Sequence, residues 1–316
     1  MSMRPLGCID MIHRVVAGVL CLALVAPAYA DGDSIPGHQI DRRTNGGITG
    51  LAMGIGLVTQ LIPLRHTDLW KVELTSFDEA VHRNYSPRAA ALSDALFGVS
   101  IAMPALYLMG TSIDDADGDK LIIYGQTLAV NTLLVGLVKR LVQRPRPYLY
   151  SNDPAARRFA KEQGEDAWLS FYSGHAALTF GAAVTGAYLL GASGASSSAR
   201  ALAWGGGMML ASTTANLRVR AGKHFYSDVI IGGLVGISVG YIVPALHADD
   251  KPYVPSGKEI AAGAAGLLGG LLLSNLLPLE KRTTERGASK PGFVKNLSLS
   301  PMPLKGGFGF ALGGGL

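Results

Sequence analysis

Long apolar segments separated by short polar ones dominate the chain from residue 89 onward. They occupy residues 89–110, 121–142, 173–190, 199–216, 228–247 and 260–277. A helix needs about 20 predominantly apolar residues to cross a bilayer, so each segment predicts a membrane-spanning helix. Small residues, which let helices approach closely in lipid, are frequent within them. The pattern predicts an all-α, multi-pass transmembrane helix bundle, with a large soluble bundle of buried helices as the alternative.

Before residue 89 the apolar stretches are shorter, and polar and apolar residues are mixed. Residues 48–63 form a Gly-rich apolar stretch that is short for a bilayer crossing. Residues 65–88 are polar with scattered apolar side chains, which indicates an amphipathic stretch at the surface or the membrane interface. At the other end of the chain, residues 297–300 and 308–310 either pair as a small hairpin or stay disordered.

The N-terminus resembles a secretory signal peptide. Arg4 and Arg14 precede a short apolar run, and Ala28-Tyr29-Ala30 is a small-residue cleavage site. We therefore predict that residues 1–30 are removed; an uncleaved first transmembrane helix is the alternative. Both cysteines of the chain, Cys8 and Cys21, lie in this leader. A mature chain without thiols excludes disulfides, cysteine nucleophiles and zinc–thiolate sites.

Charge supports the membrane interpretation and argues against nucleic acid. Charged residues make up 16% of the chain, where soluble domains have about 25%. The formal net charge is only +5, and the cations are not clustered with interleaved aromatic residues. We therefore expect no nucleic-acid partner. The oligomeric state stays open.

Three polar clusters stand at the ends of the predicted helices. The first ends the segment 121–142, the second begins 173–190, and the third links 199–216 to 228–247. Consecutive antiparallel spans place these four helix ends on one face of the membrane. The topology therefore predicts that the three clusters form one site. They contain Lys139, Arg146 and Pro147, then Ser173, Gly174 and His175, then Arg218, His224 and Asp228.

The residue types suit the binding of a phosphate group. Arginine offers a planar fork to two phosphate oxygens, and Lys139 adds a point charge. Ser173 is placed to cap a helix, whose free N–H groups bind anions, and Gly174 lets the backbone come close. His224 and Asp228 are four residues apart, so the carboxylate can contact the imidazole and fix its tautomer. A membrane-flanking anchor, an ordinary cap and a salt-bridged loop are the alternatives for the three clusters.

These motifs resemble the type 2 phosphatidic acid phosphatase superfamily, whose signature is K-x6-RP, PSGH and SR-x5-H-x3-D. The chain matches the signature at Lys139, Arg146, Pro147, Ser173, Gly174, His175, Arg218, His224 and Asp228. Two positions differ, because Tyr172 replaces the proline and Leu217 replaces the serine. The resemblance implies a fold with the core shared by these phosphatases and the vanadium haloperoxidases.

The resemblance also implies a metal-independent phosphatase without a cofactor. His224 would attack phosphorus, Asp228 would orient it, and His175 would exchange the proton of the leaving oxygen. Lys139, Arg146 and Arg218 would neutralise the phosphoryl oxygens, with Ser173 and Gly174 as further donors. Arg144, Arg220 and Lys223 would be second-rank candidates for a larger headgroup. The expected substrate is a lipid phosphate or diphosphate.

The predicted domain organisation follows from these segments. It comprises a signal peptide (1–30), a linker with short apolar or interfacial segments (31–88), a phosphatase-like catalytic bundle (89–247), an additional apolar helix (248–278) and a tail (279–316). We expect a multi-pass protein of a bacterial inner membrane. If residues 48–63 do not cross, the site faces the periplasm. A soluble secreted acid phosphatase and a haloperoxidase-like oxidoreductase are the alternative functions.

Overall fold

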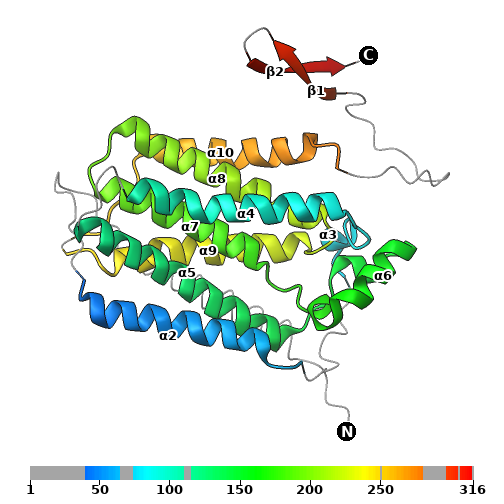
Figure 1. The fold of residues 1–316 in the computed structure, drawn as a ribbon, viewed down its shortest axis with the longest axis horizontal. Helices are drawn as coiled ribbons and strands as arrows, with labels where there is room; N and C mark the ends of the chain where they lie inside the picture. Colours follow the sequence, from blue (N-terminus) through cyan, green and yellow to red (C-terminus); the bar gives the residue numbers. More distant parts are fainter. Residues whose placement is uncertain are drawn as a thin grey trace.

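The structure, a computed structural model, describes residues 40–64, 74–109, 115–249 and 251–279, and the backbone of 297–304 and 307–314. The predicted leader lies outside these residues. Within them the chain is a bundle of long helices that run side by side (Figure 1). Their bounds are α2 Arg42–Leu61, α4 Pro87–Leu108, α5 Asp115–Val142, α7 Gly174–Ala192, α8 Ser197–Arg220, α9 Tyr226–Ala245 and α10 Gly257–Leu276.

Short elements gather at one end of this bundle (Figure 1). They are α3 Ser76–Glu79, the 3-10 helices η1 Pro147–Tyr150 and η2 Gly164–Trp168, and α6 Pro154–Gln163. In the tail, β1 Leu297–Leu304 pairs antiparallel with β2 Gly307–Gly314, so the hairpin alternative is the one that forms. The all-α prediction is confirmed for the bundle.

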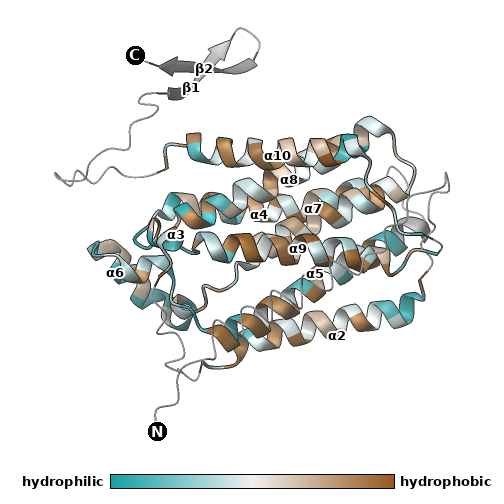
Figure 2. Cartoon of the chain, turned by 180° about the vertical axis from the view of Figure 1, so that it is seen from behind, coloured by the Kyte–Doolittle hydropathy of each residue, from teal (hydrophilic) through white to brown (hydrophobic). Residues whose placement is uncertain are grey.

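Five helices are long and apolar enough to cross a membrane, namely α4, the helical stretch that contains α5, α7, α9 and α10. They indicate a multi-pass membrane protein, and polar residues gather at the ends of the bundle (Figure 2). Helix α8 was expected to be a sixth but is not among them. Its sides are covered by α4, α7 and α10, so it can bury polar side chains such as Thr213 and Asn216.

Helix α2 is longer than the apolar stretch that predicted it. The helix begins at Arg42 because the side chain of Asp41 caps it by accepting a hydrogen bond from the backbone N–H of Arg43. The polar residues of its first turn therefore join the apolar ones that follow. It packs lengthwise along α5, and Gly56 allows the backbones to approach, since a Cβ there would lie 2.8 Å from the backbone nitrogen of Leu133.

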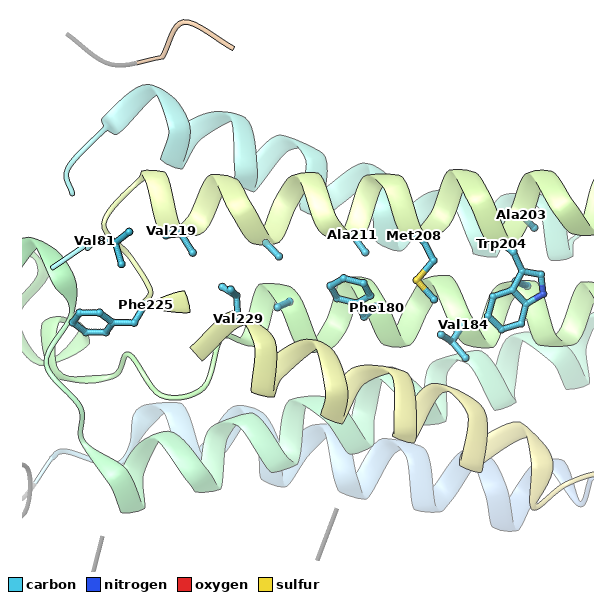
Figure 3. Close-up of a cluster of buried hydrophobic side chains, with 13 residues drawn as sticks. Val81, Phe180, Val184, Ala203, Trp204, Met208, Ala211, Val219, Phe225 and Val229 are labelled. Atoms are coloured by element: carbon cyan, nitrogen blue, oxygen red, sulfur yellow. The ribbon is translucent and has the colours of Figure 1, made fainter. Parts of the chain in front are cut away.

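The centre of the bundle is α7, which is buried along almost its whole length. An apolar cluster between α7 and α8 runs from Trp204 to Phe225 (Figure 3). At the end that carries the short elements, Val81 packs into the same cluster. The residues around α3 are thus attached to the core by apolar contact, and they cover the turn between α8 and α9.

Candidate active site

The helix ends that carry the three polar clusters meet at one end of the bundle. The C-terminal ends of α5 and α8 lie there with the N-terminal ends of α7 and α9, beside α3 and α6 (Figure 1). Backbone hydrogen bonds join them, since Ser173 donates its N–H to the carbonyl of Asp228 over 3.0 Å. The antiparallel arrangement predicted from the apolar pattern therefore does bring the clusters together.

His224 lies on the turn between α8 and α9, with its side chain only 1% exposed. Its Nδ1 is 2.7 Å from the backbone carbonyl oxygen of Ser170 and 3.7 Å from Oδ2 of Asp228. A carbonyl oxygen can only accept, so Nδ1 carries the proton and Nε2 keeps its lone pair. The predicted Asp228–His224 hydrogen bond is thus replaced by a bond to the carbonyl, with the carboxylate nearby as a charge.

Asp228 is fully buried and is occupied by other donors. Its Oδ2 accepts hydrogen bonds from the Ser170 hydroxyl over 2.5 Å and from the Phe225 N–H over 2.9 Å. Its Oδ1 accepts from Nη1 of Arg144 over 2.6 Å. Asp228 therefore holds the start of α9 and the loop at Ser170, which is the loop whose carbonyl fixes the His224 ring.

Arg144 is the other half of this arrangement. Its guanidinium also donates from Nη2 to Oδ2 of Asp78 over 2.9 Å and from Nη1 to the Ser227 hydroxyl over 2.8 Å, and it stacks 4.0 Å from the centre of the Phe225 ring. Both carboxylates and the guanidinium are nearly excluded from solvent. Burial of such charges is tolerated only when they are paired and hydrogen-bonded. Arg144 is thus a buried link between the residues around α3 and the start of α9.

The three predicted phosphate-binding cations differ in how they are paired. Arg146 donates from Nη2 to Oδ1 of Asp166 over 2.7 Å, and Arg218 donates from Nη1 to Oδ1 of Asp94 over 2.8 Å. Asp166 and Asp94 are both partly exposed, at 45% and 60%. The Lys139 ammonium has no hydrogen bond or ion pair to any residue that the structure describes.

These cations act on the nucleophile candidate. Burial lowers the pKa of the His224 imidazole well below its ordinary value of 6.5, and the nearby Arg146, Lys139 and Arg218 lower it further. The ring is therefore neutral near pH 7, which is the state with a free lone pair on Nε2. Arg146, Lys139 and Arg218 thus all act on the same imidazole.

The loop over the site, which we define as residues 143–173 between α5 and α7, is charged as well. Partial burial opposes ionisation of Asp166, but Arg146 and Lys139 outweigh it and hold the pKa of this carboxyl below its ordinary value. Burial, and then Arg146, lower the pKa of Lys223 to about 8. The Lys223 ammonium donates to the side-chain carbonyl of Gln163 over 2.9 Å and lies 4.5 Å from the centre of the Phe159 ring, so it ties α6 to the site.

The start of α7 forms as predicted, except that packing against Val135 also explains the glycine at position 174. Ser173 caps the helix, and its hydroxyl oxygen accepts from the N–H of Ala176 over 3.3 Å. Gly174 is required by packing, because a Cβ there would lie 3.0 Å from a methyl of Val135. His175 follows, with Nε2 2.9 Å from Oδ1 of Asp94 and its side chain 26% exposed.

The second-rank headgroup candidates are mostly structural. Arg144 is buried in the pairs described above, and Arg220 donates to the carbonyls of Ser274 and Leu277 at the end of α10. Only Lys223, of these three, lies beside the loop over the site. The sequence interpretation overlooked Asp78, Asp94 and Asp166. A single aspartate in a polar segment has no spacing that marks it, although each one here pairs with a motif arginine or its neighbour.

The comparisons agree with the motifs. The model of the PAP2 superfamily matches residues 120–252. These residues form a PAP2 superfamily domain. PAP2 proteins are phosphatases, so the match supports a phosphoric ester hydrolase. No curated protein and no solved structure matches the chain. The matched region begins within α5 and runs through α9 with all nine signature positions, while α2, α4 and α10 lie outside it.

Asp78 lies outside the PAP2 domain, and its removal tests the buried ion pairs. We expect Asp78→Asn to destabilise the protein by about 3 kcal/mol, because buried donors of Arg144 and Ser227 lose their charged acceptor. Thermal unfolding of the purified protein in detergent measures this. Glu79→Gln is the matched control, since Glu79 is the exposed neighbour on the same turn. Equal unfolding midpoints for the two variants would show that the buried pair contributes nothing.

Proposed function

We propose that this protein is a metal-independent lipid phosphate or diphosphate phosphatase that works through a phosphohistidine. The observation that carries the proposal is the environment of His224: a buried, neutral imidazole whose Nδ1 is held by the Ser170 carbonyl, among three cations. Such a ring offers Nε2 as a nucleophile and needs no proton transfer before it attacks. A dianionic phosphoryl group is the ligand that this concentration of positive charge favours.

The chemistry would proceed in two displacements. Nε2 of His224 attacks phosphorus, the bond from phosphorus to the leaving oxygen breaks, and that oxygen takes a proton from His175. A water molecule then attacks the phosphohistidine, gives a proton to His175 and releases phosphate, which restores the lone pair on Nε2. Lys139, Arg146 and Arg218 stabilise the charge on the transferring group. The Asp228 carboxylate, 3.7 Å from Nδ1, favours the charged ring of the intermediate.

The position of the site supports a lipid substrate. It lies at the end of a bundle whose exposed helix faces carry large apolar residues, for example Leu141 at 60% exposure. A headgroup can therefore reach the cations while its hydrocarbon chain stays in the bilayer. Phosphatidic acid, undecaprenyl diphosphate, phosphatidylglycerol phosphate and lipid A all fit this class.

Replacing the two histidines tests the mechanism. We expect His224→Ala and His175→Ala each to lower phosphate release at least about 10³-fold, because each removes a chemical step. A malachite green assay with a panel of lipid phosphates in detergent measures the loss. His247→Ala is the control, since that ring contacts Gln126 at the far end of the bundle.

Two further treatments separate this mechanism from its rivals. EDTA should leave the activity unchanged, and vanadate should inhibit, because it adopts the five-coordinate geometry of the transition state. Strict dependence on added metal would contradict the proposal. Halide oxidation by the vanadate-loaded protein would favour the haloperoxidase-like alternative, and extraction without detergent would favour the soluble acid phosphatase.

The depressed pKa of His224 predicts the acid side of the pH profile. A base whose pKa is lowered stays unprotonated as the pH falls, so kcat/KM should hold through pH 6.5 and decline only when the pH reaches the depressed pKa. The phosphate group of the substrate has a second pKa of about 6, so the pH profile is corrected with the value found by titrating the free substrate. A decline centred on 6.5 after that correction would show an ordinary, solvated imidazole.

We further propose a bacterial inner membrane location with the site toward the periplasm. Helix α2 bears on this orientation, because its 20 residues lie along α5 and its last residue is at the site end. If α2 crosses the bilayer after a cleaved leader, the site faces the cytoplasm instead. The periplasmic proposal therefore requires that α2 does not cross, and it is supported by the absence of α2 from the five described helices that are long and apolar enough to do so.

Cysteine labelling decides the orientation. In a background with Cys8 and Cys21 replaced by serine, Lys161→Cys on α6 should react with a membrane-impermeant maleimide in cells whose outer membrane has been permeabilised. Lys258→Cys, at the start of α10 and the opposite end of the bundle, is the matched control and should react only after lysis. The reverse pattern would place the site in the cytoplasm.

A further inference from the structure

Helix α4 contributes a carboxylate to the site from outside the matched PAP2 region. Oδ1 of Asp94 is 2.9 Å from Nε2 of His175 and accepts a hydrogen bond from Nη1 of Arg218 over 2.8 Å. One oxygen atom therefore joins the predicted proton donor to a predicted phosphate-binding cation. Three residues further along the same helix, the Phe97 ring lies 4.5 Å from the His175 ring, centre to centre. Both groups that orient His175 thus come from one turn of α4.

The two histidines of the site are anchored through opposite ring nitrogens. His224 is held at Nδ1 by the Ser170 carbonyl, so its Nε2 is the reactive atom. His175 is held at Nε2 by Asp94, and its Nδ1 has no hydrogen-bond partner within the described part of the chain. An ionised carboxylate can only accept, which assigns the Nε2 proton to His175. The nitrogen left to exchange protons with a substrate is then Nδ1.

From this geometry we infer that Asp94 is the positioning residue for His175, fixing the ring so that Nδ1 exchanges the proton of the leaving oxygen. The inference rests on the proposed phosphatase function. In the first displacement His175 has to react as the imidazolium, with protons on both ring nitrogens: Nδ1–H gives its proton to the oxygen released from phosphorus, and the ring becomes the neutral Nε2–H tautomer. In the second, Nδ1 takes a proton from the attacking water. The bond from Nε2–H to Asp94 is kept throughout both steps.

Because His175 and Arg218 share Oδ1 of Asp94, the three side chains hold one another in place. Arg218 anchors Asp94 and is itself anchored, because Nη1 also donates to the Ser93 hydroxyl over 3.2 Å and the backbone carbonyl of Arg218 accepts from the N–H groups of Lys223 and His224. The carboxylate that orients His175 is therefore tied to the turn that carries His224. Preorganisation of this kind holds both reacting groups in place before substrate binds.

The test uses the dependence of the rate on the leaving group. An aryl phosphate such as p-nitrophenyl phosphate releases a stable anion and needs little help from an acid, whereas an alkyl phosphate such as dioctanoyl phosphatidic acid needs protonation. The full-length protein is assayed in detergent as kcat/KM, which reports transfer to His224 before the substrates converge on one phosphoenzyme. Ala91→Asn, at an exposed position one turn away on α4, is the matched control.

We expect Asp94→Asn to lower kcat/KM for the alkyl phosphate about 10- to 100-fold and to change the aryl phosphate by less than about 3-fold. Combined with His175→Ala, it should add no further loss, because Asp94 acts through His175. Equal losses on both substrates, no loss on either, or additive losses in the double variant would overturn the inference. A wild-type protein that hydrolyses neither substrate would instead contradict the proposed function.

Discussion

The buried guanidinium of Arg144, held between Asp78 and Asp228, is the interaction on which the site depends. It joins three stretches that are distant in the sequence: the residues around α3, the turn after α5 and the start of α9. Removing these charges from water is costly unless all of them are paired at once. The turn that carries His224 can therefore adopt its position only when the other two stretches are in place. Stacking on Phe225 adds an apolar contact to the same junction.

A second constraint is the balance of charge around the candidate phosphate site. Several cations placed close together repel one another unless anionic groups lie near them. The structure meets it with carboxylates, because Asp166 pairs with Arg146 and Asp94 pairs with Arg218. Both carboxylates are partly exposed, so they can yield these arginines to an incoming phosphoryl group without being buried unpaired.

Much of the fold follows from local physics, and the remainder does not. Apolar length predicted the helices, and antiparallel alternation predicted that the three clusters meet, because neither depends on distant contacts. The enclosed position of α8 was not predictable, since it is decided by packing against α4, α7 and α10. In the site, the His224–Asp228 spacing predicted proximity correctly, but the carbonyl of Ser170 takes the hydrogen bond. That outcome depends on the loop path, which no spacing encodes.

The division between matched and unmatched residues has a physical meaning. In the proposed mechanism, the motif residues inside 120–252 are the groups that would touch a phosphoryl group. The carboxylates of Asp78 and Asp94, outside that region, accept hydrogen bonds from motif residues or their neighbours. A carboxylate that orients another side chain can be supplied from any element able to pack there. The candidate phosphoryl-binding residues therefore lie in the PAP2 domain, while their alignment depends on α4 and on the residues around α3.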